Sequence, residues 1–403
     1  MYTICMQTIA IFGRQPALGL VELESLVGSP AITPLPHGAA LIDIDPAQIP
    51  FTRLGGTMKL AKVLTTLDTT AWPDIQDFLV TNTPEHAAAL PDGKLTIGLS
   101  CYGLRVNPKQ LHAAGLSVKK AIRAAAPRPV RLVPNTEPTL SSAQVLHNHL
   151  TEERGWELIL IKHGQQTILA QTTHIQDIEA YAARDQARPA RDARVGMLPP
   201  KLAQIIINLA AGQMTVHSSQ LTVLDPFCGT GVVLQEALLM GYHVVGSDLE
   251  PRMIEYTGQN LEWLSEMTHQ PQLFHEYTRE LSVGDATNVT WPSFDTIACE
   301  TYLGRPFTTE PRQDKLAEVM RDVDTITRKF LQNVARQTQP GLRLCIAVPA
   351  WHTTMGIKHL QTLEKLGELG YTRIEFAHAR TDELIYHREG QVVGRELVVL
   401  VRK

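Results

Sequence analysis

The 403-residue sequence lacks the features that mark several large classes of protein. No apolar run approaches the ~20 residues that a membrane-spanning helix needs. The N-terminal stretch has no basic segment followed by a small-residue cleavage site, so we expect no secretory signal. Low-complexity segments and internal repeats are also missing. These absences favour a globular protein with no membrane partner.

Cysteine is scarce, and the five cysteines lie far apart in the chain. None belongs to a Cys-x-x-Cys pair or to a Cys/His cluster, which argues against a zinc site and against a disulfide framework. We therefore expect no metal ion and a reduced, cytoplasmic setting.

The length and the pattern of apolar residues predict more than one domain. A chain of 403 residues exceeds the size at which single hydrophobic cores stop growing. Strand-like and helical segments are mixed over residues 1–180, where 156–161 and 166–172 predict a hairpin. We predict an α+β region at 1–180, a linker at 181–200 and an α/β domain at 201–403.

Acidic residues are missing from residues 93–136, whereas the whole chain has a net charge of −4. The same segment holds eight basic residues, and such a local excess indicates a surface that binds a polyanion. A solvated helix face is the other interpretation. Six of the eight are the candidate binding residues: Lys109, Lys119, Lys120, Arg123, Arg128 and Arg131.

The most informative segment is 221–248, which reads LTVLDPFCGTGVVLQEALLMGYHVVGSD. A short apolar run predicts a buried strand, a Gly-rich turn follows at 225–231, and a helix is expected over 232–240. A second apolar strand ends at Asp248. This order predicts a βαβ nucleotide-binding unit, in which the carboxylate of Asp248 can bind both ribose hydroxyls.

The turn differs from the usual dinucleotide-binding turn, which reads G-x-G-x-x-G and aims a helix N-terminus at a pyrophosphate. Here the turn reads Asp-Pro-Phe-Cys-Gly-Thr-Gly. The carboxylate of Asp225 at its start would repel a phosphate, so the turn suits a cationic ligand better than an anionic one.

This turn resembles motif I of class I S-adenosylmethionine (SAM) methyltransferases, in the form found in enzymes that methylate amino groups of RNA and DNA. Before it, Arg188-Pro189, the run GMLPPKLA from Gly196 to Ala203, and Asn208-Leu209-Ala210 resemble the matching segment of tRNA guanine-N2-methyltransferases that act on guanosine 10. Those enzymes carry an RNA-binding THUMP domain before the catalytic domain. The resemblance covers residues 180–300 well and the N-terminal half more loosely, where 109–131 and 140–142 look THUMP-like.

The resemblance implies a Rossmann-like class I methyltransferase domain preceded by a THUMP-like, RNA-binding region. It also implies SAM as the cofactor and tRNA as the partner, with the six basic residues on the RNA. The residues it places at the cofactor are Asp225, Phe227, Gly229, Gly231, Asp248, Asp285 and Ala286. For Asp285, an Asx turn or a helix cap is the other interpretation.

Both prolines of the family's catalytic motif, [Asp/Asn]-Pro-Pro-[Tyr/Phe], are missing from this chain. After the fourth predicted strand it reads Cys299-Glu300-Thr301-Tyr302. If Tyr302 is aligned with the aromatic residue, Cys299 falls at the acidic position; if Glu300 is aligned with the acid, Tyr302 comes one residue early. We predict that Glu300 accepts a hydrogen bond from the substrate amine and that Tyr302 stacks on the extruded base.

Several C-terminal features leave alternatives open. Trp351 either lines the base pocket or covers the core, and three arginines either contact phosphates or are solvated: Arg380, Arg388 and Arg395. A helix is expected over 357–369.

The sequence favours methyl transfer to guanine N2 in tRNA. The alternatives are a DNA amino-methyltransferase and a non-catalytic, SAM-binding RNA-binding protein. A monomer and a complex with a small partner protein both remain open.

Overall fold

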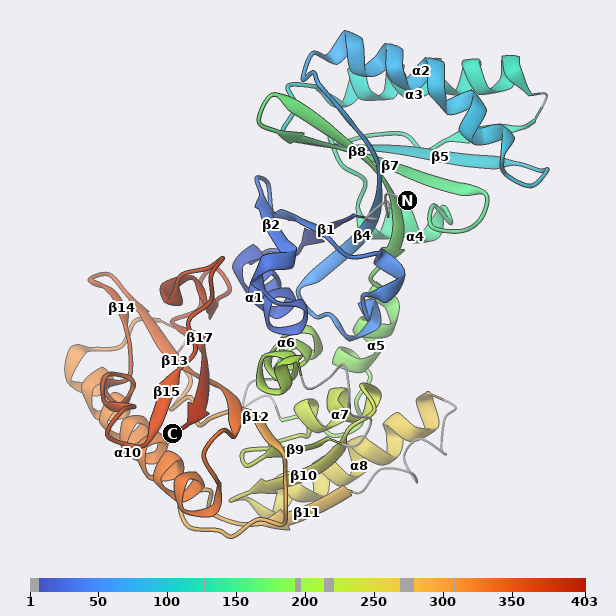
Figure 1. Cartoon of the computed structure of the whole chain (residues 1–403). Coiled ribbons are helices and arrows are strands. Elements are labelled where there is room, and N and C mark those ends of the chain that lie inside the picture. Colours follow the sequence, from blue (N-terminus) through green and yellow to red (C-terminus); the bar gives the residue numbers. More distant parts are fainter. Residues whose placement is uncertain (1–6, 127, 193–196, 214–220, 269–278, 308) are drawn as a thin grey trace. The chain divides into compact units, whose positions relative to one another are not determined.

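The computed structural model describes residues 7–126, 128–192, 197–213, 221–268, 279–307 and 309–403, and its elements are labelled in Figure 1. Its contacts divide the chain into two compact units. The first unit comprises Met1–Pro16, Pro30–Thr52 and Thr57–Glu179, and the second comprises Ala17–Ser29, Arg53–Gly56 and Ala180–Lys403. Two short segments of the expected N-terminal region thus fold with the C-terminal part. Gly196 of the family-like run lies outside the described residues.

The first unit is built on an eight-stranded sheet in the order β2-β3-β1-β4-β8-β7-β5-β6. The strands are β1 (Thr8–Phe12), β2 (Ile32–Leu35), β3 (Ala39–Ile42), β4 (Thr57–Leu67), β5 (Leu95–Tyr102), β6 (Val130–Leu132), β7 (Gly155–His163) and β8 (Gln166–Ile175). Its helices are α2 (Trp72–Ala88), α3 (Pro108–Ala125) and the short α4 (Ser142–His147). The apolar residues of α2 and α3 share one core with β5 and β7.

Local sequence explains two of these elements. Helix α3 begins at a capping box, in which Asn107 accepts from the backbone of Gln110 and the Gln110 side chain accepts from the backbone of Asn107. The predicted hairpin is confirmed by the antiparallel pairing of β7 with β8, which places His163 opposite Gln166. The left-handed φ of 61° at Gly164 closes this turn.

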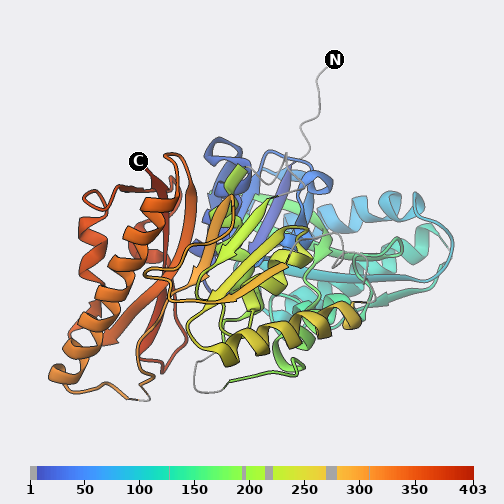
Figure 2. The same ribbon diagram turned by 90° about the horizontal axis from the view of Figure 1, so that it is seen from below.

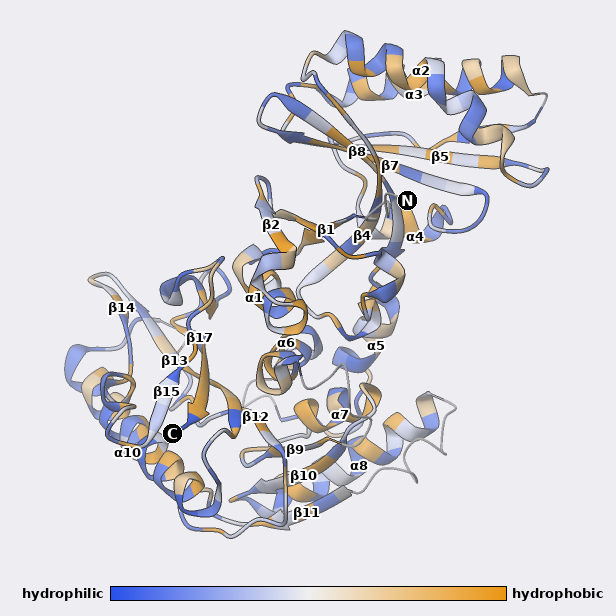
Figure 3. Cartoon of the chain, in the orientation of Figure 1, coloured by the Kyte–Doolittle hydropathy of each residue, from blue (hydrophilic) through white to orange (hydrophobic). Residues whose placement is uncertain are grey.

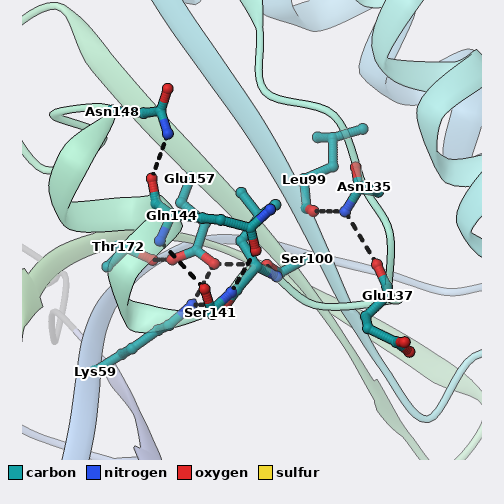
Figure 4. A network of polar contacts seen from close by, with 11 residues as sticks. Lys59, Leu99, Ser100, Asn135, Glu137, Ser141, Gln144, Asn148, Glu157 and Thr172 are labelled. Atoms are coloured by element: carbon teal, nitrogen blue, oxygen red, sulfur yellow. Dashed lines mark hydrogen bonds and ion pairs between the residues drawn. The ribbon is translucent and has the colours of Figure 1, made fainter.

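A buried polar network joins the strands of the first unit to the loop before α4 (Figure 4). Glu157 on β7 is 0% exposed and accepts bonds from Lys59, Ser100 and Thr172. Lys59 also donates to the carbonyl of Leu140, and the backbone N–H of Leu140 donates to Ser100. The network therefore fixes the loop to the sheet from its buried side.

The second unit is built on a nine-stranded sheet whose main path runs β11-β10-β9-β12-β13-β17-β15. The strands are β9 (Thr222–Asp225), β10 (His243–Asp248), β11 (Arg279–Val283), β12 (Thr296–Glu300), β13 (Arg343–Thr353), β14 (Gly356–Lys358), β15 (Tyr371–Arg373), β16 (Ile385–Tyr386) and β17 (Val393–Arg402). Strands β9 to β13 pair in parallel, and β17 runs antiparallel to both of its main-path neighbours, β13 and β15.

Helices cover both faces of this sheet, as expected for strands that are apolar on both sides. One core contains residues of α1 (Pro16–Val27), α6 (Pro200–Ala211), α7 (Val232–Leu239) and α8 (Pro251–Met267). The opposite core contains α10 (Gln313–Gln337). Figure 2 shows α8 beside the β10–β11 side of the sheet. In Figure 3 the strands β12 and β17 are hydrophobic, whereas α10 has a polar outer face.

The prediction of a helix over 357–369 is wrong. Residues Gly356–Lys358 form β14, which pairs with the end of β13, and Gln361–Lys365 form one 3-10 turn. The backbone N–H of Thr362 donates to Asp324 on α10 at 2.7 Å. Pairing with a neighbouring strand and with a distant helix therefore overrides the local helical pattern. Among the described residues, no helix is long and apolar enough to cross a membrane.

Candidate functional site

The site predicted from the sequence lies where the strand order of the second unit reverses. From β9 the chain continues to β10 and β11 on one side, and β12 and β13 lie on the other side. In open parallel sheets, ligands bind at the carboxyl ends of the strands beside such a reversal. Asp225, Asp248 and Glu300 are the last residues of β9, β10 and β12. Three predicted site residues are therefore brought to the same edge.

The Gly-rich turn after β9 depends on two glycines with positive φ. Gly229 has a φ of 52°, and a Cβ placed there would meet nothing closer than a carbonyl oxygen at 4.0 Å. Gly231 has a φ of 82°, and its Cβ would meet the side chain of Thr257 at 2.9 Å. Gly229 thus exposes bare backbone to open space, which is what close approach of a ligand needs, and Gly231 allows α8 to pack against the turn.

Asp248 is linked directly to this turn. One carboxylate oxygen accepts from the backbone of Gly229 at 2.9 Å, and the other accepts from the backbone of Glu250 at 3.0 Å. Each oxygen can accept a second hydrogen bond, so these contacts leave capacity for two hydroxyl groups. The contacts orient the carboxylate at the turn, in agreement with its predicted ribose-binding role.

The edge is strongly acidic. Burial raises the pKa of Asp225 well above its usual range, and the nearby carboxylates of Asp248 and Glu300 raise it further, against one backbone hydrogen bond from Phe227. Burial also raises the pKa of Asp248. Burial and mutual repulsion oppose the ionisation of Asp225 and Asp248, and a cationic ligand would favour it. The structure therefore agrees with the preference for a cation inferred from the turn sequence.

The remaining predicted cofactor residues have identifiable contacts. Phe227 is half-buried and packs edge-on against Phe330 of α10, with ring centroids 5.1 Å apart. Asp285 accepts from the backbone of Thr287 at 2.8 Å, which is the Asx turn considered above. Ala286 is buried, and its carbonyl accepts from Asn333 at 3.1 Å. These contacts fix the loop after β11, and cofactor binding by the three residues stays a prediction.

The altered catalytic motif places its side chains in different surroundings. Cys299 is 0% exposed and packs in the core on the α10 side of the sheet. Glu300 follows it at the end of β12 and forms an ion pair with Arg395, while Tyr302 is 43% exposed. The register that puts Cys299 at the acidic position would therefore leave that position buried among apolar groups. The geometry favours Glu300 as the carboxylate of the site.

Sequence reasoning missed the residues that support the turn from α8. Thr257 donates to the carbonyl of Gly229, and Asn260 donates to the carbonyls of Thr230 and Ala190. Both side chains are fully buried. Their spacing of three residues on a helix was the available signal, because it puts two polar groups on one otherwise buried face.

Two of the open alternatives are decided by burial. Trp351 is 0% exposed and belongs to the core, so it does not line a pocket. Arg395 is 9% exposed and bound to Glu300, so it is neither solvated nor a surface contact for phosphate. Arg380 is exposed and pairs with Asp382, two residues away.

The basic residues of the first unit fall into two groups. Lys109, Lys120 and Arg123 on α3 are exposed, Lys119 is half-buried, and Arg131 on β6 is exposed. The guanidinium of Arg128 donates instead to three backbone carbonyls, those of Ala87, Pro91 and Gly93. Arg128 therefore holds the end of α2 in place. A phosphate group would have to compete with these three carbonyls for the guanidinium of Arg128.

Comparisons with known proteins agree with this geometry. Residues 217–369 match the family model described as a methyltransferase domain. The structure of TrmN from Thermus thermophilus aligns over 99% of this chain and 100% of its own, with a TM-score of 0.51 at 18% identity. The second unit has the class I methyltransferase fold. The fold class predicted from the sequence is confirmed.

Two curated relatives are both named tRNA (guanine(10)-N2)-dimethyltransferase. The protein from Pyrococcus abyssi is 27% identical over 186 residues, which are 45% of this chain and 48% of the relative. The protein from Methanothermobacter thermautotrophicus is 44% identical over 80 residues, 19% of this chain and 22% of the relative. The chain therefore spans about half, or less, of the length of these relatives.

Proposed function

We propose that this chain is a SAM-dependent methyltransferase that acts on the exocyclic N2 amine of a guanine in tRNA. The observation that carries the proposal is the meeting of Asp225, Asp248 and Glu300 at the strand reversal of a methyltransferase fold. The names of the two curated relatives support tRNA and guanine N2 as the substrate class. The reduced, cytoplasmic setting expected from the sequence is part of this proposal.

The residues at the edge fit this cofactor. SAM supplies an electrophilic methyl group on a positively charged sulfur. Gly229 gives room for close approach of the methionine part, and Asp248 can accept from both ribose hydroxyls. The surplus of carboxylates favours a positive charge at this place. Asp285 and the loop after β11 would contact the adenine.

In the proposed reaction bound SAM would supply the methyl group to the substrate nitrogen and leave as S-adenosylhomocysteine, and the amine proton would then be lost to solvent. Glu300 accepts a hydrogen bond from the amine, which aims the nitrogen lone pair at the methyl group. Little base catalysis is required, because the methylated amine is acidic enough to lose its proton unaided. Tyr302, exposed at the same edge, stacks on the extruded base.

The first unit would bind the RNA backbone, as the THUMP-like resemblance implies. The exposed basic residues of α3 supply the positive charge, so the affinity for tRNA should fall steeply with salt. The double substitution K120A/R123A should reduce the slope of log affinity against log salt, by roughly one for each phosphate contact that is lost. The matched control K62A removes an exposed lysine from β4 and should leave the slope unchanged.

The deciding experiment is methyl transfer from labelled SAM to tRNA that lacks the modification, followed by nucleoside mass spectrometry. We expect N2-methylguanosine to appear. SAM binding without transfer to tRNA, ribosomal RNA or DNA would contradict the proposal and favour the non-catalytic SAM-binding alternative suggested by the missing prolines. Transfer to double-stranded DNA in preference to tRNA would favour a DNA amino-methyltransferase.

A further inference from the structure

Arg395 belongs to a part of the second unit that the cofactor motifs do not include. It lies on β17, and β13 separates β17 from β12, which carries Glu300 (Figure 1). In the sheet register, Glu300 is opposite Ala347 of β13, and Arg395 is opposite Pro349, two residues further along the same strand. The arginine side chain therefore reaches across β13 to the glutamate, over the small side chain of Ala347.

The contact between the two side chains is directional. The Nε–H of Arg395 donates to Oε1 of Glu300, and the two side chains are only 11% and 16% exposed. Within the described part of the chain, Oε2 of Glu300 receives no hydrogen bond from the protein. One oxygen is thus fixed by the arginine, and the other remains available as an acceptor at the carboxyl end of β12.

The charges around Glu300 explain why it needs a cation. Burial raises the pKa of Glu300 above its usual value, and the charge and hydrogen bond of Arg395 offset only part of this rise. The carboxylate of Asp225 lies close enough to interact with it, and the buried thiol of Cys299 is its chain neighbour. Without Arg395, these surroundings would favour the protonated acid, whose O–H would donate to the amine rather than accept from it.

We infer that Arg395 is the positioning residue of the altered catalytic motif: it fixes Glu300 through Oε1 and opposes its protonation, so that Oε2 can accept the hydrogen bond of the substrate amine. The inference rests on the proposed function. In this arrangement a side chain from β17 supplies the rigidity that a Pro-Pro sequence would give to the loop after β12.

The second unit also provides a matched control. Glu396, the next residue of β17, faces the other side of the sheet and pairs with Arg373 at 2.9 Å, with side chains 3% and 20% exposed. R373M therefore removes the arginine of β15 from a buried glutamate of β17 that is not part of the predicted site and that keeps His359 as its second partner, at 2.6 Å. A purely structural role of Arg395 would make R395M and R373M behave alike.

The test measures kcat, KM for tRNA, SAM affinity and pH dependence in the full chain. We expect R395M to lower kcat ~10- to ~100-fold at neutral pH, as expected for a misplaced acceptor, with SAM affinity unchanged. The acidic limb of its kcat profile should move to higher pH, so that activity partly recovers in alkali. R373M should keep the wild-type profile. Infrared difference spectra against E300Q should show the acid form of Glu300 persisting to higher pH in R395M.

The outcomes separate the inference from the proposed function. If E300Q retains full activity, the methyltransferase function stands, but Glu300 is not the acceptor and the inferred role of Arg395 falls with it. If E300Q is inactive while R395M matches wild type or R373M in kcat and pH profile, only the role of Arg395 is overturned. Should R395M fail to fold, R395K serves instead: it keeps the charge but loses the Nε–H, so we expect a several-fold lower kcat with the acidic limb unmoved. Wild-type kcat in R395K would contradict the inference.

Discussion

The two units each bury a glutamate completely, but they satisfy it in different ways. In the first unit, Glu157 meets the ammonium group of Lys59 and two hydroxyl groups (Figure 4). In the second unit, Glu22 of α1 receives only neutral donors, namely the backbone N–H groups of Gly55 and Gly56 and the side-chain amide of Asn208. No ion pair to Glu22 occurs in the described part of the chain.

The two glutamates therefore respond differently to pH. The charge of Glu157 is neutralised within the network, so the network links four strands and a loop as one electrostatic unit. No counter-ion contacts Glu22 among the residues that the structure describes, and burial raises its pKa from 4.5 to about 7, in opposition to its three hydrogen bonds. Glu22 therefore makes the second unit sensitive to pH near neutrality.

The largest expected effect is that of K59M. The substitution leaves Glu157 buried without a cation and removes the donor to Leu140, so we expect a loss of ~3–5 kcal/mol in the free energy of unfolding. Hydrogen exchange measured by mass spectrometry should show this loss in peptides of the first unit. K62M, an exposed lysine on the same strand, is the control and should change stability by less than about 0.5 kcal/mol. Equal effects of the two would mean that the network contributes little.

The next effect is the pH dependence of the second unit. Between pH 4.5 and about 7 the folded carboxyl of Glu22 keeps a proton that the unfolded one has lost, so stability falls as pH rises through this window. At ~1.4 kcal/mol for each pH unit, the total fall is ~3 kcal/mol, and stability is then constant above pH 7. Hydrogen exchange in peptides from α1 and α6, measured at several pH values, reports this fall in stability. A contribution from Glu22 that rose with pH over this range would show that its three hydrogen bonds outweigh burial.

A smaller loss is expected for E22Q at pH 5, where Glu22 is already neutral and the substitution brings no relief from a buried charge. The amide keeps one acceptor oxygen but turns an NH2 group toward one of three donors, which leaves a buried N–H unsatisfied at a cost of ~1–3 kcal/mol. The variant should also lose the fall in stability between pH 4.5 and 7. Denaturant titrations of both proteins at pH 5 and pH 8 test this. The prediction fails if the two proteins respond to pH in the same way.

The smallest expected effect concerns Arg128 in the first unit. R128A removes three hydrogen bonds to carbonyls that water can partly replace, so we expect a loss of ~1 kcal/mol. The affinity for tRNA should change less than in K120A/R123A, whose side chains are exposed. Filter binding at several salt concentrations, together with thermal unfolding, compares the variants. If R128A lost more affinity for tRNA than K120A/R123A, Arg128 would have to be counted among the residues that bind RNA.

Local patterns predicted much of the second unit. The apolar run before Asp225, the glycines at 229 and 231 and the helix that follows are all present. Each of these features is specified by adjacent residues, because a positive φ requires glycine at one position and a buried strand requires a short run of apolar residues. The prediction of a helix over 357–369 was wrong because this segment depends on a distant contact: the backbone N–H of Thr362 donates to Asp324 of α10, 38 residues earlier in the chain.

The division of the chain was also beyond local patterns. Nothing in the sequence of α1 showed that Leu18 and Val21 pack in the core of the second unit. Glu22, in the middle of this apolar helix, was the available signal. A carboxylate there needs donors, and Gly55, Gly56 and Asn208 supply them from two other segments.

Local sequence is sufficient to predict the βαβ unit, the glycine-rich turn and the acidic residues at the ends of β9 and β10, because each is encoded within a few consecutive residues. It also named Glu300, but left open whether Glu300 or Cys299 takes the acidic position. Only the tertiary structure decided this, by burying Cys299 in the core and placing Arg395, 95 residues later in the chain, against Glu300. The physical reason is that strand neighbours and sheet register bring distant residues together, and no local pattern specifies which strands will be neighbours.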